Sequence, residues 1–215
     1  MSNLTLALGR PTLADRLFSR SLALDAVLVL AGAAFVAVLA QVTIPLEPVP
    51  ITGQTLAVLL VGVTLGATRG GLALLVYAVL GLIGLPVYAP QDNGTHLTGL
   101  AALASPSYGF VIGFIFAAIL TGWLAQKQWD RKAVRALLAF FAGSVVPFAF
   151  GLPWLAAWLG NAGYANDLQS VLTAGFYPFI IGGVVKAVVG AAIIYLAWVA
   201  VRSSDRRKAA KPLGE

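Results

Sequence analysis

The chain has 215 residues, of which 60% are hydrophobic and only 10% are charged, and its mean hydropathy is +0.90. A soluble domain carries about 25% charged residues, so the composition excludes an ordinary water-soluble protein and indicates an integral membrane protein. The chain contains no cysteine and a single histidine, His96. This excludes disulfides, thiolate catalysis and a metal site built from several histidines or cysteines. The net charge of +6 indicates membrane topology rather than nucleic-acid binding in such a chain.

Six apolar runs predict an all-α fold with six transmembrane helices. The runs cover residues 22–42, 54–65, 71–85, 108–125, 133–159 and 172–201. The second and third runs are short, and Arg69, Gly70 and Gly71 mark a predicted turn between them. The fifth run contains Pro147 and Pro153, which lack a backbone donor, so we expect a kink there.

The runs divide the chain into a cytoplasmic or interfacial segment (1–21), a six-helix membrane domain (22–201) and a basic cytoplasmic tail (202–215). With the N-terminus inside, every lysine and arginine except Lys186 lies in a segment on the inner side. By the positive-inside rule, both termini are predicted to be cytoplasmic. Residues 13–18 suit either a short interfacial helix or a frayed tail.

Motifs for catalysis are absent from the sequence. There is no G-x-x-x-x-G-K-[ST] phosphate loop, no HExxH motif and no serine–histidine–acid arrangement. Asp25 lies near the inner end of the first run, and Glu47, Asp92 and Asp167 lie in predicted outer loops. A proton relay or sodium site made of intramembrane carboxylates is therefore not supported. We expect no catalytic residue, no metal and no cofactor.

Lys186 is the only charged residue of the sixth predicted span, 172–201. Counted from Pro178, it lies about 12 Å into its helix, where a lysine costs roughly 2.5–3.5 kcal/mol to insert. Gly182 and Gly190 share its helix face and leave room for a hollow beside the ammonium group. We predict that Lys186 faces a ligand cavity on the outer side and favours a carboxylate or another strong acceptor. A snorkelling or purely structural lysine is the alternative.

Two predicted outer loops supply further candidates for ligand contacts. Residues 44–53 hold three prolines and adjoin a polar cluster, and residues 86–107 form the longest outer loop. Loops of this length are often lids or binding loops. With Lys186, the candidate binding residues are Thr52, Gln54, Tyr88, Asn93, Tyr108, Phe110 and Trp154. An interfacial aromatic belt is the alternative for the tyrosines and the tryptophan, and His96 is expected to be a solvated loop residue.

Three stretches carry a resemblance to a known family. Residues 45–89 read PLEPVPITGQTLAVLLVGVTLGATRGGLALLVYAVLGLIGLPVYA, residues 104–114 read ASPSYGFVIGF and residues 150–160 read FGLPWLAAWLG. The first contains a P-x-x-PVPIT-x-QT run and a Y-x-x-LG-x-x-GLPV stretch, and the last contains G-x-PWL-x-x-x-LG. These stretches resemble BioY, the biotin-specific S component of energy-coupling factor (ECF) transporters.

The resemblance implies a six-helix S component in a bacterial inner membrane. Such a subunit captures biotin from outside and delivers it inward when partner coupling and ATPase subunits drive reorientation of the whole subunit. The resemblance also implies that a small-residue face of the first helix, with Ala33 and Ala37, contacts the coupling subunit. The lipid bilayer is the other expected partner, and no nucleic acid is expected.

The chain departs from the family pattern near the start of the last helix. The family has P-G-D-x-x-K there, and this chain reads FYPFIIGGVVK. Lys186 matches the family lysine, whereas Gly183 occupies the acidic position and offers no acceptor. Asn93 or Asp92 in the long outer loop could supply one instead. The departure leaves open an S component for another small vitamin or carboxylate; a membrane-embedded enzyme or scaffold is the alternative from another class.

Overall fold

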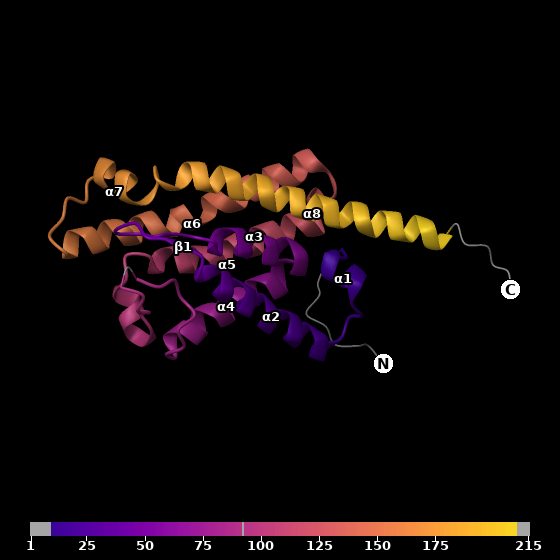
Figure 1. Ribbon diagram of the computed structural model, residues 1–215, viewed down its shortest axis with the longest axis horizontal. Helices are drawn as coiled ribbons and strands as arrows, with labels where there is room; N and C mark the ends of the chain where they lie inside the picture. The colour runs from indigo at the N-terminus through magenta and orange to yellow at the C-terminus, as the bar shows by residue number, and fades with distance from the viewer. Residues whose placement is uncertain (1–9, 92, 210–215) are drawn as a thin grey trace.

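The computed structural model describes residues 10–91 and 93–209 and is mostly helical (Figure 1). Its α-helices are α1 (Leu13–Leu17), α2 (Leu22–Ala40), α3 (Gln54–Leu65), α4 (Ala67–Leu82), α5 (Tyr108–Gln126), α6 (Ala133–Asn161), α7 (Leu168–Gly175) and α8 (Phe179–Ala209). Two short 3-10 helices, η1 (Gly99–Ala104) and η2 (Trp129–Arg131), and one hairpin of β1 (Thr43–Ile44) and β2 (Ile51–Thr52) complete the described part of the chain.

Four helices, α2, α5, α6 and α8, are long and apolar enough to cross a membrane. Helices α3 and α4 have 12 and 16 residues. At 1.5 Å per residue they reach about 18 and 24 Å, less than the roughly 30 Å hydrocarbon core of a bilayer. The helical membrane class is therefore confirmed with four candidate spans, and the two short helices pack among them.

The turn predicted at Arg69 lies three residues too late in the sequence. Helix α3 ends at Leu65 and α4 already begins at Ala67, so Arg69 belongs to α4. The turn is made at Gly66, whose φ of +88° lies in the region that glycine adopts without steric cost. The hydropathy of the sequence cannot locate this turn, because the helices on both sides of it are apolar.

The sixth predicted span, residues 172–201, is wrong in one respect, because it is not one continuous helix. Asp167 accepts hydrogen bonds from the backbone of Gln169 and Ser170 and caps the short helix α7. The chain then turns before α8 begins at Phe179. Pro178 lacks the N–H that a continuous helix requires, which gives the physical reason for the break.

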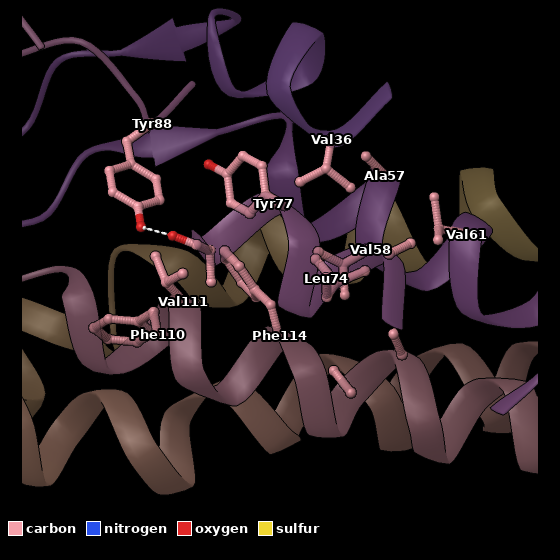
Figure 2. Packing of buried hydrophobic residues seen from close by; sticks show 14 of the residues in the cluster. Val36, Ala57, Val58, Val61, Leu74, Tyr77, Tyr88, Phe110, Val111 and Phe114 are labelled. Atoms are coloured by element: carbon pink, nitrogen blue, oxygen red, sulfur yellow. Dashed lines mark hydrogen bonds between the residues drawn. The ribbon is translucent and has the colours of Figure 1, made fainter. Parts of the chain in front are cut away.

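The core lies where α3, α4 and α5 meet. Figure 2 shows Val58, Leu74, Tyr77 and Phe114 side by side in this region, and all four are buried. A second cluster, with Leu59, Phe140 and Ile194, joins α3 and α6 to α8. Helices α6 and α8 run along the long axis, and the far end of α8 extends past the other helices (Figure 1). Close helix packing is the main attraction available to helices in lipid.

A buried ionic cluster ties α1 to the rest of the bundle. The Arg69 guanidinium donates hydrogen bonds to Asp25 Oδ1 at 3.1 Å and to Asp15 Oδ1 at 2.8 Å. It also reaches Thr12 Oγ1 at 3.2 Å, and only 2% of Arg69 is exposed. Burial raises the pKa of the Asp15 carboxyl, but hydrogen bonds from Thr12 and Arg20 and the nearby Arg69 and Arg20 charges bring it below its usual value. Of the two alternatives for residues 13–18, the structure thus contains the short helix, and Arg69 is buried rather than a solvent-facing turn residue.

Candidate ligand-binding cavity

A cavity of about 390 Å³ opens beside the β1–β2 hairpin. The hairpin lies toward the end of the bundle remote from α1 (Figure 1). The first loop, the loop after α4, and helices α5, α6 and α8 all contribute to the wall. Its aromatic lining residues are Tyr88, Tyr108, Phe110, Phe114, Phe148 and Phe179, and its polar ones are Glu47, Thr52, Gln54, Thr55, Gln91, Asn93, Ser105, Ser107, Ser144 and Lys186. A mainly apolar hollow with a few converging polar groups is typical of a small-molecule site.

The structure brings seven of the eight predicted binding residues to this one cavity. They are Thr52, Gln54, Tyr88, Asn93, Tyr108, Phe110 and Lys186. Trp154 does not line the cavity. Its indole Nε1 donates a hydrogen bond to Ser105 O at 2.9 Å, and its ring centroid lies 5.7 Å from that of Tyr108. Trp154 thus supports the wall from behind, while ligand contact by the other residues stays a prediction.

Lys186 reaches the cavity from α8. Its Nζ donates a hydrogen bond to the backbone oxygen of Thr52 at 2.6 Å, which joins α8 to the hairpin. The predicted hollow beside it lies on one side only. A Cβ built at Gly182 would meet only Ile51 Cγ2, at 3.9 Å, and one at the neighbouring Gly183 meets nothing within 4 Å, whereas a Cβ at Gly190 would lie 2.2 Å from Phe140 Cε1. The expectation of open space at Gly190 is therefore wrong, because the Phe140 ring fills it.

A short chain of hydrogen bonds continues from the hairpin into the core. Thr52 Oγ1 donates to Gln54 Oε1 at 2.8 Å, and Gln54 Nε2 donates to the Tyr77 hydroxyl at 2.5 Å. Gln54 is the first residue of α3, so the hairpin directly before it positions its side chain. Tyr77 is fully buried on α4 and fixes the Gln54 amide. Lys186, Thr52 and Gln54 line the cavity, and hydrogen bonds connect them to Tyr77, which lies in the core and outside the cavity lining.

Aromatic rings form another part of the cavity wall. Tyr88 packs edge-on against Tyr77 at 5.5 Å and against Tyr108 at 6.2 Å between ring centroids. Its hydroxyl donates to Ala78 O at 2.6 Å (Figure 2). Burial raises the pKa of the Tyr88 hydroxyl, which keeps this group a neutral donor. Because Tyr88 and Tyr108 are each only 7% exposed, they are interior groups and not members of a lipid-facing belt.

The long loop after α4 covers the rim of the cavity. His96 Nδ1 lies 2.8 Å from Tyr88 O and the residue is partly buried, so the expectation of a solvated histidine is wrong. Asn93 is exposed, and its Oδ1 accepts hydrogen bonds from the Thr95 backbone N–H and hydroxyl. Asp92, the other candidate acceptor, lies outside the described residues. Sequence reasoning missed Tyr77 and Ser144, because a single polar residue in an apolar helical run looks like ordinary core.

The predicted coupling residues lie on α2, away from the cavity lining. Ala33 is 2% exposed and belongs to the hydrophobic core. Ala37 is half-buried and packs against the same core. Ala34, between them, is exposed. A partner chain can thus reach Ala34 directly but reaches Ala33 only if α2 moves, and the coupling role of Ala33 and Ala37 stays a prediction.

No metal centre is evident in this part of the molecule. Within residues 10–91 and 93–209, no group of three or more histidine, cysteine, aspartate or glutamate side chains is placed to hold a metal ion. The chemistry that the cavity offers is recognition: a lysine donor, an amide, hydroxyl groups and aromatic surfaces.

A model of the BioY family matches residues 12–203 of the chain. The chain belongs to the BioY family. This confirms the resemblance seen in the sequence. The biotin transporter BioY of Rhizobium etli is 39% identical over 151 residues, which cover 67% of this chain and 75% of that protein. Biotin transporter BioY2 of Lactococcus lactis subsp. cremoris is 35% identical over 161 residues, 75% of this chain and 82% of the relative.

The fold of this BioY-family chain is that of a known S component. A crystal structure of the S-component for biotin from an ECF-type ABC transporter superposes on the chain with a TM-score of 0.58 and 24% sequence identity. The match covers 80% of this chain and 89% of the other. The likeness shows the fold, and membership of the BioY family, whose named relatives are biotin transporters, places the chain among transport proteins rather than enzymes.

Proposed function

We propose that this chain is the high-affinity biotin-binding membrane subunit of an ECF-type vitamin uptake transporter. The observation that carries the proposal is the cavity beside the hairpin, where Lys186 and Gln54 meet aromatic walls in a BioY-family chain. The relatives named above are biotin transporters, and their similarity extends over two thirds or more of the chain.

The lining residues suit the chemistry of biotin. Biotin carries an anionic carboxylate, a planar ureido group and an apolar bicyclic and alkyl frame. Lys186 supplies a charge-assisted donor for an acceptor oxygen, and such hydrogen bonds are stronger than neutral ones. Gln54 and Thr52 offer further polar contacts, and Tyr108 and Phe110 cover the apolar frame. A volume of about 390 Å³ lies within the usual range of ligand pockets.

The proposed mechanism needs partner subunits and a defined orientation. Six helices, α2 to α6 and α8, cross or enter the inner membrane of a bacterium, and both termini face the cytoplasm. The basic residues support this orientation, since Arg16, Arg131 and Arg202 gather around α1, η2 and the end of α8, opposite the hairpin. A coupling subunit and ATPase subunits then drive inward release. Reporters fused after Lys132 and in the loop 91–98 should report the cytoplasm and the outside; the reverse result rejects the orientation.

The test of the ligand is a titration of the purified chain in detergent. Biotin should bind tightly with one site per chain, and unlabelled biotin should compete while thiamine, riboflavin and simple carboxylates should not. Gly183, in place of the family aspartate, is the observation that favours the second candidate, an S component for another small vitamin or carboxylate. Tighter binding of one of these competitors than of biotin would establish that second candidate and reject the first.

A further inference from the structure

A second cavity, of about 300 Å³, lies at the opposite end of the bundle from the first. It is formed where the chain around α1 meets η2 and the last turns of α8. Four arginines line it, namely Arg10, Arg16, Arg131 and Arg202, together with the single carboxylate Asp205. Nothing in biotin capture uses this arrangement.

The positive charge of this cavity is only partly neutralised. Arg16 Nη2 pairs with Asp205 Oδ2 at 2.5 Å. Within the described residues no carboxylate lies within ion-pair distance of the other three arginines, although Asp130 is the chain neighbour of Arg131. The Asp130 Oδ2 atom accepts a hydrogen bond from the Trp198 indole, and the Asp130 carboxylate offsets part of the Arg131 charge from behind the cavity lining. A net excess of guanidinium groups therefore faces the cavity.

Two of these guanidinium groups are held in place before any ligand arrives. The Arg131 guanidinium stacks over the Trp198 ring at 4.5 Å, and its Nη2 donates to Pro11 O at 3.1 Å. Its Nε is buried and has no hydrogen-bond partner among the described atoms. Arg202 Nε donates to Trp198 O at 3.2 Å. Fixed planar guanidinium groups with spare donors match the oxygen geometry of a phosphate group.

The cavity also lies at the level of lipid headgroups. Trp198 and Asp205 are 19 and 26 residues beyond Phe179, so α8 carries them about 29 and 39 Å from its start. The hydrocarbon core is about 30 Å thick and the headgroup regions extend the bilayer to roughly 40–45 Å. Leu17 and Phe18, which follow the lining residue Arg16 in the chain, and Val199, which follows the lining residue Trp198, are exposed apolar residues, which suit acyl chains next to a phosphate.

We propose that this arginine cavity binds the phosphate group of an anionic ligand. An anionic phospholipid of the inner leaflet is the source that the flanking apolar residues favour, because it presents a phosphate and acyl chains together. A soluble phosphate compound is the other source of the same chemistry. The site is separate from the proposed biotin cavity, and it does not depend on the identity of the transported vitamin.

The test measures the thermal unfolding midpoint of the purified full chain in detergent. Phosphatidylglycerol is added to one sample, phosphatidylcholine to a second at the same mole fraction, and glycerol 3-phosphate to a third. Phosphatidylglycerol should raise the midpoint by several degrees and phosphatidylcholine should not. A rise with glycerol 3-phosphate equal to that with phosphatidylglycerol would support the phosphate site and assign its ligand to the soluble source.

Single-residue variants distinguish specific binding in this cavity from non-specific attraction of anions to a basic surface. Arg10→Gln and Arg131→Gln should each remove at least half of the rise caused by phosphatidylglycerol. Arg135→Gln and Arg206→Gln remove the same charge from exposed arginines outside the cavity lining, and should retain the rise. Equal rises in all four variants, or no difference between the two lipids, would overturn the proposal. Arg10 is exposed, so its variant keeps the test valid if Arg131→Gln folds poorly.

Discussion

Lys186 and Thr52 are 134 residues apart in the sequence, yet the lysine Nζ donates a 2.6 Å hydrogen bond to the threonine backbone oxygen. The bond fixes the amine on the wall of the cavity. A lysine ammonium has three N–H donors, so at least one remains to serve a ligand. The same bond connects the start of α8 to the hairpin, which couples the position of α8 to the shape of the cavity.

Replacement of Lys186 tests its role as the charged donor. If it gives a charge-assisted hydrogen bond to biotin, Lys186→Ala should cost about 1.5–3 kcal/mol of binding free energy, roughly a 10- to 150-fold rise in Kd. Titration of biotin in detergent measures this. Lys132→Ala, an exposed change outside the cavity lining, is the matched control and should bind as the parent does. An unchanged Kd in Lys186→Ala would show that the lysine has a structural role only.

Gly183→Asp restores the acidic residue of the family pattern. Because a Cβ at this position meets nothing within 4 Å, we expect the variant to fold, to keep biotin binding and to place a carboxylate at the cavity. Gly190→Ala is the steric comparison on the same helix, since its Cβ would approach Phe140 to 2.2 Å. It should lower the unfolding midpoint, whereas Gly183→Ala should not. Loss of biotin binding in Gly183→Asp would mean that the ligand itself occupies the space at Gly183.

Tyr77 is predicted to act on the ligand through Gln54. Tyr77→Phe removes the hydroxyl that accepts from Gln54 Nε2 and frees the amide to rotate. Leaving a buried donor unsatisfied costs about 1–3 kcal/mol, divided between stability and binding. We expect a weaker biotin affinity with the overall fold retained, measured by titration and circular dichroism. Tyr164→Phe, at an exposed position, is the control; equal affinities in the two variants would show that Tyr77 does not orient Gln54.

The candidate site could be predicted largely from local patterns. Lys186 stood out as a charge in an apolar helix, and Gln54 and Thr52 stood next to a proline-rich loop. Tyr77 could not be predicted, because its importance comes from a hydrogen bond to Gln54 across 23 positions. The all-helical class could be predicted from hydropathy, but the ends of the helices could not. The break at Pro178 and the turn at Gly66 depend on backbone geometry, and an apolar run hides both.

The role of Arg69 shows the same limit for charges. In the sequence it is a basic residue beside two glycines, which indicates a cytoplasmic turn. Its carboxylate partners, Asp15 and Asp25, lie 54 and 44 positions away, and only the packing of α1 and α2 on α4 brings them together. A topology rule counts charges and carries no information on which of them become buried ion pairs.

Arg69 is predicted to be important for stability. Arg69→Met leaves two buried carboxylates without their shared guanidinium, and such a loss typically costs about 3–5 kcal/mol. Arg16→Met removes an exposed ion pair with Asp205 and should cost about 0–1 kcal/mol. The two are compared by unfolding in detergent. Since the folded-state pKa of Asp15 is below its usual value, its contribution is complete above about pH 4 and falls as the pH drops further. Similar stabilities of the two variants would contradict the cluster's role.

Two adjacent alanines test which face of α2 meets the proposed coupling subunit. Ala34 is exposed and Ala33 is buried. If the coupling subunit packs on the exposed face, Ala34→Leu should reduce co-purification with that subunit and ATP-driven uptake, because small residues allow close helix contact. Biotin binding by the isolated chain should persist, since α2 does not line the cavity.

Ala33→Leu serves as the matched change on the inner face. Its larger side chain must fit into the core, and overpacking of this kind usually costs about 1–3 kcal/mol. We therefore expect a lower unfolding midpoint for Ala33→Leu, and an unchanged one for Ala34→Leu. The reverse pattern, in which Ala33→Leu stays stable and loses its partner while Ala34→Leu keeps it, would mean that the face with Ala33 and Ala37 contacts the coupling subunit, as the family resemblance implies.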